Sequence, residues 1–389
     1  MYKPLIRTVT LGVAAPHPIS PAVVEEKALL ARRAESACRA AGYEVQTVRL
    51  STRSVFGDLA GRKPSEIVSY AHELQTVLDD AGIGYCSLGP ADAADPEFPL
   101  GTLDVIGDLL IGAESLSCTV QTGTRQHGVR SEAAAPVARI IRRLAEGTAQ
   151  GLGNFRFAMV ACVDPGGPFF PAAHHSGPDS LAIGLQGAGI VAQAMREVGR
   201  LDPAAITRRV RQALIEHAAP VAEIAERTGK ELGPAFGGID LSPAPAGDDS
   251  IAAAMESCLT GPVGGPGTLA VTAALTEAIR STGLPTCGYN GVMLPVLEDT
   301  RLAQRWHEGT VNAQQLLAYS AVCGTGLDTI PLPGDTTEDE IAGLLTDVAA
   351  MAVRLRKPLS ARLFPVPGKE SGERTTFNSP YLVNTSVKR

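Results

Sequence analysis

The amino-acid sequence predicts an α/β fold in which parallel strands are joined by crossover helices. Strand-like and helix-like segments alternate along nearly the whole chain of 389 residues. Hydrophobic residues make up 44% of the chain and charged residues 19%, which is typical of a protein with a substantial core. No low-complexity linker and no fixed-period repeat interrupts this pattern. We therefore expect a single compact α/β domain over residues 1–389 rather than two separable domains.

Hydrophobic periodicity sets the expected elements of the first half. Residues 42–51 predict a strand because Val45, Thr47 and Arg49 alternate with residues of the opposite face. Apolar residues at three- and four-residue spacing predict helices elsewhere. The other strands are expected at 6–14 and 83–90, the helices at 20–41 and 64–82, and a short helix followed by a strand at 105–121.

The second half repeats the alternation, with more glycine in its turns. The expected strands are 155–163, 180–195, 236–245 and 359–368, and residues 286–296 are expected to form a strand and a loop. The expected helices are 133–151, 202–228, 269–283, 312–324 and 339–358. This order is compatible with either an open sheet or a closed barrel.

Charge and cysteine content exclude several classes of protein. A net charge of −7 argues against a nucleic-acid binder, and the densest basic cluster, Arg139 to Arg143, has the spacing of a solvated helix face. No apolar run reaches membrane-helix length and no signal-peptide core precedes the first strand, so we expect a cytoplasmic protein. The seven cysteines are scattered without a CxxC pair, which favours free thiols over a zinc site or disulfides.

Sites in parallel α/β folds form in the loops that leave the carboxyl ends of strands. The chemically richest such loop is Cys162–Gly177, "CVDPGGPFFPAAHHSG". It combines Asp164 and two aromatic side chains, Phe169 and Phe170, with His174 and His175, which lie on opposite faces if the segment is extended. We expect one histidine to be a general acid or base, and we leave open a purely structural role for both.

Two further loops carry carboxylates. Asp240 ends an apolar strand, where a carboxylate needs a partner, a metal ion or a capping role. The stretch 286–300 adds Cys287, Tyr289, Asn290, Glu298 and Asp299. Asp299 fits the start of the following helix, while Glu298 is left open as a ligand of a divalent cation such as Mg²⁺ or Ca²⁺, together with Asp240.

The remaining candidates lie in glycine-rich segments. Cys323 precedes a Gly-x-Gly turn that is followed by Asp328, and the pattern lacks the residues of a Rossmann or Walker motif. The run 261–268 precedes a helix, but its prolines make it a weak anion motif and a structural turn remains the alternative. Arg125 and its neighbours are expected either to bind an anionic substrate or to be surface charges.

Several of these motifs together resemble one family. "FGGIDLSPAP", "CGYNGVMLPVLEDTRLAQR", "VCGTGLDTIPLPGDT" and "RLFPVPGK" resemble, in order and spacing, the motifs of the uncharacterised bacterial and archaeal family called domain of unknown function 711, or uncharacterised protein family 0210. "IRTVTLGV" and "PGGPFFPAAHH" are also similar to it. Residues 131–389 match best, while the N-terminal strands and helices of 1–130 include the part that matches least.

This resemblance implies an α/β barrel of about ten strands, similar to that of pyruvate formate-lyase and other glycyl radical enzymes. The C-terminal segment lacks the glycyl radical motif, since "RTTF" stands at Arg374–Phe377. We therefore expect no radical chemistry. The barrel would bring the loops of Cys287 and Cys323 toward one centre, which makes either cysteine a candidate nucleophile.

From these residues we expect an enzyme that acts on a small polar or anionic metabolite without an organic cofactor. The catalytic candidates are His174, His175, Asp164, Cys287 and Cys323. The substrate-binding candidates are Phe169, Phe170, Asn290, Tyr289, Asp240, Asp328 and Arg125, and the metal candidates are Asp240 and Glu298. Lyase or isomerase chemistry is favoured over hydrolysis, and a homo-oligomer is expected. The alternative is a non-catalytic ligand-binding or regulatory protein that uses the same pocket.

Overall fold

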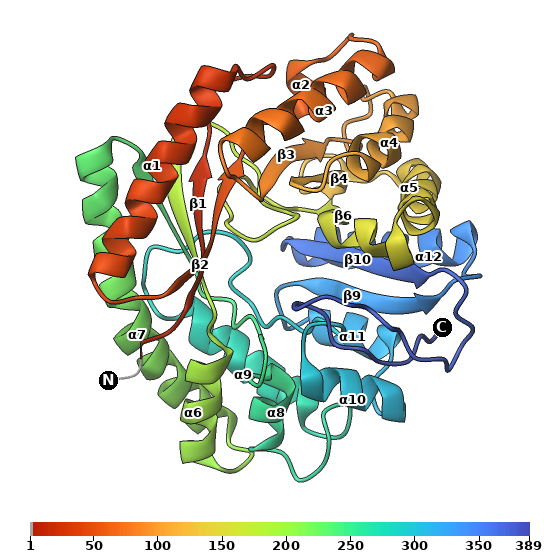
Figure 1. Cartoon of the computed structure of the whole chain (residues 1–389). Helices are drawn as coiled ribbons and strands as arrows, with labels where there is room; N and C mark the ends of the chain where they lie inside the picture. The colour runs from red at the N-terminus through yellow and green to blue at the C-terminus, as the bar shows by residue number, and fades with distance from the viewer. Residues whose placement is uncertain (1–2) are drawn as a thin grey trace.

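The computed structural model describes residues 3–389 and is built on one curved ten-stranded sheet with helices around its outside (Figure 1). The strand order is β8-β7-β1-β2-β3-β4-β6-β10-β9, and the short β5 pairs with β4. The strands are β1 Ile6–Gly12, β2 Val45–Ser51, β3 Cys86–Ala91, β4 Leu116–Thr124, β5 Gly128–Val129, β6 Phe157–Ala161, β7 Ser180–Leu185, β8 Ala235–Asp240, β9 Gly326–Pro333 and β10 Leu359–Val366.

The strands fall into two groups that run in opposite directions. β1, β2, β3, β4 and β6 are mutually parallel, as the sequence predicts. β7 pairs antiparallel with β1 and continues in parallel to β8, while β10 pairs antiparallel with β6 and continues in parallel to β9. The carboxyl ends of the two groups therefore lie at opposite ends of the sheet, and the predicted post-strand loops do not all meet at one end.

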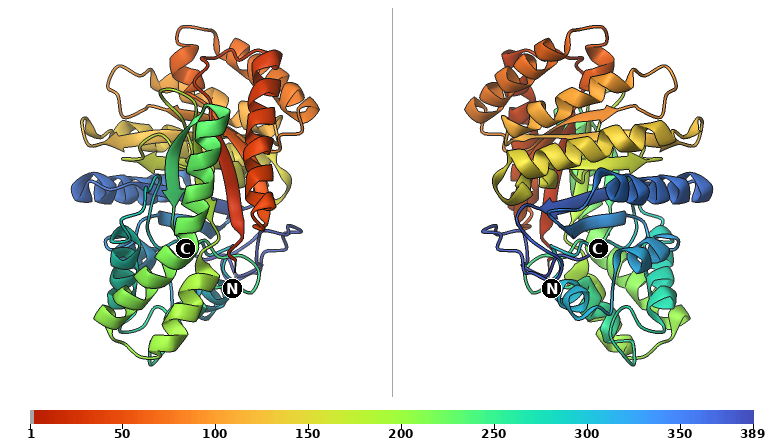
Figure 2. Two further views of the ribbon diagram at one scale, coloured as in Figure 1. Left: turned by 90° about the vertical axis from the view of Figure 1, so that its left-hand side faces the viewer. Right: turned by 90° about the vertical axis from the view of Figure 1, so that its right-hand side faces the viewer.

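Twelve α-helices are assigned within residues 3–389, and Figure 2 shows from two sides that they surround the sheet. They are α1 Pro21–Ala40, α2 Val55–Asp58, α3 Pro64–Asp80, α4 Val105–Ile111, α5 Ala134–Gly147, α6 Ala188–Val198, α7 Pro203–Leu232, α8 Ile251–Glu256, α9 Thr268–Arg280, α10 Thr300–Glu308, α11 Ala313–Ser320 and α12 Glu338–Leu355. Three 3₁₀ segments complete the elements, η1 Leu100–Asp104, η2 Ser131–Ala133 and η3 Ala149–Arg156. No helix of the described residues is long and apolar enough to cross a membrane.

The alternation of side chains along the strands separates an outer core from an inner face. On β10, Leu359, Ala361 and Leu363 belong to the large core cluster beneath the helices, whereas Ser360 and Arg362 point to the inner face. On β6, the inner residues join Phe169 and Tyr289 in a separate small apolar cluster. The inner face is therefore filled by loops rather than by helices.

The gap between edge strands β8 and β9 is spanned by the irregular segment 285–296. It makes one isolated parallel bridge to each edge, Ile239 with Thr286 and Pro295 with Asp328. The expected ten strands are present, but no continuous ladder closes them into a barrel. Glycine is the reason that this segment remains irregular, because Gly288 has a φ of +80° and a side chain there would collide with Asp240.

Two expected elements differ in the structure. The segment expected as one strand over 180–195 ends as β7 at Leu185, and α6 begins at Ala188 after Gly187. The stretch 322–336, treated above as a glycine-rich loop, contains β9, in which all eight residues are buried. The Gly-x-Gly turn forms the start of this strand. Its second glycine, Gly326, lies closely against the backbone of Ser360 on β10, which leaves no room for a side chain.

A buried histidine joins the segment after β1 to its neighbours. The Nδ1 of His17 lies 2.7 Å from the Tyr70 hydroxyl on α3, and its Nε2 lies 2.9 Å from Thr52 Oγ1. Burial lowers the pKa of His17 from 6.5 to about 4, because a charged imidazole is poorly solvated there. The native state therefore holds this ring neutral near pH 7.

The His17 pKa predicts an acid-sensitive contribution to stability. A depressed histidine pKa means that the unfolded state binds the proton more readily, so this contribution is complete above pH 6.5 and is lost as the pH falls toward about 4. The slope is about 1.4 kcal/mol per pH unit within that window. Urea unfolding of His17→Gln between pH 7 and pH 4 should show a flatter pH dependence than wild type. The exposed control His307→Gln should keep the wild-type slope, and equal slopes for all three proteins would refute the assignment.

Candidate functional site

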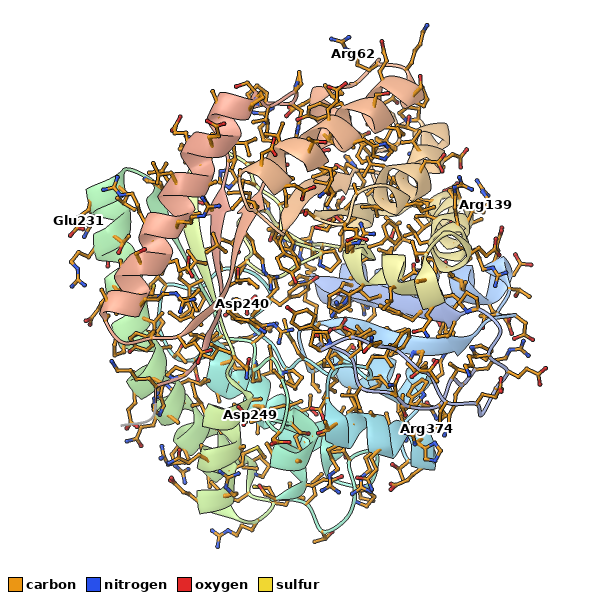
Figure 3. All side chains as sticks on the ribbon, in the orientation of Figure 1. Arg62, Arg139, Glu231, Asp240, Asp249 and Arg374 are labelled. Atoms are coloured by element: carbon orange, nitrogen blue, oxygen red, sulfur yellow. The ribbon has the colours of Figure 1, made fainter. Side chains whose placement is uncertain are left out.

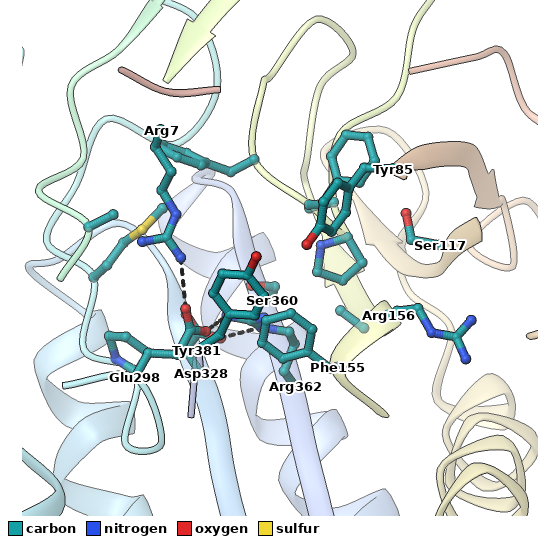
Figure 4. Close-up of a pocket in the computed structure, with 18 of the residues that line it drawn as sticks. Arg7, Tyr85, Ser117, Phe155, Arg156, Glu298, Asp328, Ser360, Arg362 and Tyr381 are labelled. Carbon is teal, nitrogen blue, oxygen red and sulfur yellow. Dashed lines mark hydrogen bonds and ion pairs between the residues drawn. The ribbon is translucent and has the colours of Figure 1, made fainter. Parts of the chain in front are cut away.

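A cavity of about 90 Å³ lies on the inner face of the sheet, and several buried charged side chains line it (Figure 4). Arg7 of β1, Arg49 of β2 and Arg362 of β10 point into it from three strands. Six aromatic side chains contribute to its walls, those of Tyr85, Phe155, Phe169, Phe170, Tyr289 and Tyr381. It is a small apolar cavity with a few charged groups, which is the usual composition of a ligand site.

Four charged side chains form a continuous ion chain along this cavity. Arg7 Nη2 lies 2.9 Å from Glu298 Oε2, and Arg362 Nη2 lies 2.6 Å from Glu298 Oε1. Arg362 then pairs through Nε with Asp328 Oδ1 at 2.5 Å. Burial raises the pKa of Glu298, but the charges of Arg362 and Arg7 outweigh it and hold that pKa below its usual value. Two cations and two anions in this chain compensate one another.

Local strand geometry explains why Arg7 can reach this chain. The register of β1 against β7 shifts between Ile6 and Thr8, which is where Arg7 stands. Val9 and Leu11 then return to the outer core. A basic residue inside an apolar strand is therefore turned to the inner face by an irregularity in the ladder.

Arg49 lies in the same cavity without a carboxylate partner. Its Nε donates a hydrogen bond to Thr47 Oγ1 at 2.9 Å, and no ion pair to it occurs among residues 3–389. Its guanidinium lies 4.9 Å from the Tyr85 ring centroid and 5.2 Å from that of Phe170. Burial and the nearby charge of Arg7 lower the pKa of Arg49 to about 10, so it remains a cation at neutral pH.

Tyr289 brings a hydroxyl into the cavity. This hydroxyl is buried and makes no hydrogen bond of normal geometry within the described chain, although Ser360 of β10 lies near it. Burial raises the pKa of Tyr289, and the charge of Asp328 adds to the increase. Only Oδ1 of Asp328 is paired with Arg362, which leaves Oδ2 without a protein partner among the described residues.

Asp240 fixes the turn that carries Tyr289, and it lies near the middle of the molecule (Figure 3). Its carboxylate accepts backbone N–H groups of Tyr289 at 2.8 Å, Ser242 at 2.9 Å and Asn290 at 3.2 Å. Asn290 has a φ of +48°, and its side chain completes the turn by accepting from the backbone N–H of Leu241 at 3.2 Å. The structure thus gives Asp240 a positioning role, which is one of the alternatives left open above.

A second cavity, of about 410 Å³, lies on the other side of Phe169, Ala172 and Tyr289, which line both. Asp164, Asp240, Cys287 and Asn290 line it. Burial and the Asp240 carboxylate raise the pKa of Cys287 well above its usual value, so its thiol is protonated at neutral pH. Asp164 is 68% exposed and paired with Arg125 at 2.9 Å, so these two residues form a surface ion pair.

Both histidines of the loop Cys162–Gly177 lie outside the described linings of these two cavities. His174 is buried with Nδ1 3.2 Å from the Ala172 carbonyl oxygen, and burial lowers its pKa. His175 packs against Gly12, where any side chain would collide with the ring, and its Nε2 lies 2.9 Å from the Pro178 carbonyl oxygen. The structure therefore does not bring either imidazole to the cavity that contains the arginines.

The remaining predicted residues are also separated. Cys323 is buried outside both cavity linings as the structure describes them, and its carbonyl accepts a hydrogen bond from Lys357. The two predicted metal ligands, Asp240 and Glu298, line different cavities, and each carboxylate is occupied by donors of the protein. Residues 3–389 contain no cluster of three or more His, Cys, Asp or Glu with metal-binding geometry. Asp299, in contrast, caps α10 through the Leu302 N–H, as its position predicted.

Sequence reasoning missed the three arginines that define the first cavity. Their signal is present in the sequence, because "IRTV", "TVRLS" and "ARLF" each place one arginine inside an otherwise strand-like run. A buried charge is costly unless it is paired, so an arginine on the inner face of a strand marks either an ion network or a ligand site. Arg7 and Arg362 belong to an ion network, whereas Arg49 has no carboxylate partner among the described residues.

The ion chain predicts a large loss of stability when its central carboxylate is removed. Glu298→Gln leaves Arg7 without a counter-charge and should lower the free energy of unfolding by about 3 kcal/mol, measured by urea denaturation. Glu308→Gln is the control, because that glutamate pairs with Arg305 at the surface. If both substitutions lowered the free energy of unfolding by the same small amount, a structural role for the ion chain would be contradicted.

Comparison with known proteins places this chain among uncharacterised relatives. The family model "Uncharacterised ACR (DUF711)" matches residues 1–378. A "UPF0210 protein" of Pyrobaculum arsenaticum is 34% identical over 284 residues, which cover 70% of this chain and 61% of the relative. The match therefore spans about three fifths of that relative's length. "UPF0210 protein" relatives of Desulfovibrio desulfuricans and Carboxydothermus hydrogenoformans are 30% and 27% identical, each over 96% of this chain and 88% of the relative.

A solved structure gives a much weaker similarity. The chain titled "Crystal structure of methanol:cobalamin methyltransferase complex MtaBC from Methanosarcina barkeri" is 10% identical, with a TM-score of 0.24 over 91% of this chain and 67% of the other.

Proposed function

Since the chain belongs to the uncharacterised DUF711 (UPF0210) family, we propose from the chemistry of its first cavity that it is an enzyme for a small anionic metabolite, acting by acid–base catalysis. The observation that carries this proposal is Arg49, a buried cation without a carboxylate partner in the described chain. An uncompensated buried charge is costly, and an anionic ligand would remove that cost. Two flanking aromatic rings reduce the cost without neutralising the charge.

Proton transfer is assigned to Tyr289 and Asp328. The Tyr289 hydroxyl makes no hydrogen bond of normal geometry to residues 3–389 and carries its proton at neutral pH, so it can donate to a substrate. Asp328 has a free Oδ2, which can accept a proton, while Arg362 fixes its other oxygen. A proton donor and a proton acceptor in one small cavity suit a lyase or an isomerase. Covalent catalysis by Cys287 is not favoured, because its thiol lines the other cavity and is protonated at neutral pH.

This proposal replaces the histidines as the favoured acid and base, because a catalytic group must reach the reacting atoms. Catalysis by His174 or His175 would require a movement of their loop toward the cavity. The alternative function remains a ligand-binding or regulatory protein that holds the same anion without converting it. The two functions differ in one respect only, which is whether the bound compound is consumed.

The remaining expectations stay predictions. We propose a small-molecule partner and no organic cofactor, and the donors that occupy Asp240 and Glu298 give a divalent cation no support. Metal analysis of the purified protein tests that point. Homo-oligomer formation, a cytoplasmic location and the finer likeness to a closed pyruvate formate-lyase-type barrel are likewise proposals.

Substitutions in the cavity test binding and turnover separately. The protein is incubated with a fractionated metabolite extract, and depletion of anionic compounds is followed by mass spectrometry. Tyr289→Phe and Asp328→Asn should each reduce depletion at least about a hundredfold, the usual contribution of a general acid or base, while the protein still retains the compound on filtration. His174→Gln should leave depletion within about twofold of wild type.

Arg49→Gln should reduce retention of the compound, because the cation that compensates the ligand's charge is lost. Arg62→Gln, at an exposed arginine, is the matched control and should behave as wild type. If the wild-type protein retained the compound without consuming it, the proposal of an enzyme would be overturned in favour of a ligand-binding protein. Loss of depletion in His174→Gln but not in Tyr289→Phe would overturn the assignment of the acid.

A further inference from the structure

We infer that the anion taken by this cavity is a single carboxylate on a short apolar body, bound end-on by Arg49. The inference rests on the proposed function, in which the cavity takes a small anion, and it adds the class of that anion. It draws on three independent features of the cavity, namely the edge of Arg49 that is left open, the charge of the lining groups and the apolar walls.

The surroundings of Arg49 leave only one edge of its guanidinium available. Tyr85 and Phe170 lie over the guanidinium, and their rings are nearly perpendicular to each other at a centroid distance of 6.5 Å. The Nε edge is used by Thr47 Oγ1. The two terminal nitrogens make no hydrogen bond to the described chain, and they are not sealed from the cavity. A pair of coplanar N–H donors matches the two oxygens of one carboxylate.

Among the side chains that point into the cavity, the positive charges exceed the negative charges by one, so a ligand with one negative charge would balance them. Arg7 and Arg362 are compensated by Glu298 and Asp328, since each of the four is in an ion pair. Arg49 is the remaining cation that points inward.

Arg156 also lines the cavity, but the charge that opposes it is that of Glu114, outside the cavity lining, and not that of a cavity carboxylate. The Arg156 guanidinium points away from the other labelled side chains (Figure 4), and its Nη1 donates to the carbonyl oxygens of Ala113 and Leu116. A dianion such as phosphate or a dicarboxylate would therefore bring in one uncompensated negative charge beside Glu298 and Asp328.

The apolar side chains that line the cavity indicate the size and polarity of the uncharged part of the ligand. Phe169, Phe170 and Met293 supply apolar surface, and the Tyr289 hydroxyl supplies one donor. A volume of about 90 Å³ admits only a short body. The combination favours a monocarboxylate with few atoms beyond its carboxylate over a sugar acid or a nucleotide, which would need many more polar partners.

Calorimetric titration of the full chain with defined probes tests the charge and shape of the ligand. The probes are butanoate, the neutral amide butanamide, the dicarboxylate succinate and inorganic phosphate. Butanoate should bind at least about tenfold more tightly than each of the other three, which corresponds to about 1.4 kcal/mol. Arg49→Gln should remove that preference, and Arg62→Gln should keep it.

Arg49→Lys separates end-on pairing from charge alone. It retains the positive charge but loses the fork of two donors, so it should weaken butanoate at least about tenfold while the melting temperature stays near that of wild type. An unchanged affinity in Arg49→Lys would overturn end-on binding.

Preference for succinate or phosphate, or no binding of butanoate by wild type, would overturn the carboxylate class. The proposed function would still hold after such a result if Arg49→Gln failed to retain the anionic compound that the wild-type protein retains from the metabolite extract. It would fail separately if butanoate bound as expected while no metabolite was consumed.

Discussion

The ion pairs of Glu298 are the interaction on which the rest of the structure depends. This carboxylate binds Arg7 of β1 and Arg362 of β10, which belong to the two oppositely directed groups of strands. It closely follows the irregular segment 285–296 that spans the gap between β8 and β9, so it joins the end of that segment to the sheet. Because Arg362 also binds Asp328, two buried cations are compensated, whereas Arg49 has no carboxylate partner among the described residues.

The inner loops divide the space that the curved sheet encloses. The loop after β6 places Phe169 against Gly184 of β7, and its Pro168 carbonyl accepts a hydrogen bond from Thr10 at 3.2 Å. The segment at Gly288 meets it at Gly167, where backbone lies against backbone. Phe169, Ala172 and Tyr289 line both cavities and separate the cavity of the arginines from the cavity of Cys287. Asp164 of the loop after β6 therefore lies in the cavity of Cys287 and not in that of the arginines.

The sequence predicted local structure well where periodicity is strong and failed where long-range contacts decide. The parallel strands β1, β2, β3, β4 and β6 and the cap at Asp299 follow from patterns within a few residues. The reversed direction of β7 and β10 does not, because it depends on which strand each one pairs with. Tyr289 and Asp328, predicted as binding residues, line the cavity of the arginines, but the histidines were favoured for their chemistry and are turned away by packing against Gly12 and Ala172. The arginines of β1, β2 and β10 were overlooked because single charges in strands resemble surface residues.

Crystal structures of the protein with and without butanoate test most directly the claim that Arg49 is an unpaired buried cation awaiting a carboxylate. The ligand-free structure should show both terminal nitrogens of Arg49 free of protein carboxylates. The soaked structure should show the butanoate oxygens ~3 Å from these nitrogens, with the alkyl chain against Phe169 and Phe170. A protein carboxylate on Arg49, or butanoate bound elsewhere with Arg49 unchanged, would contradict the account.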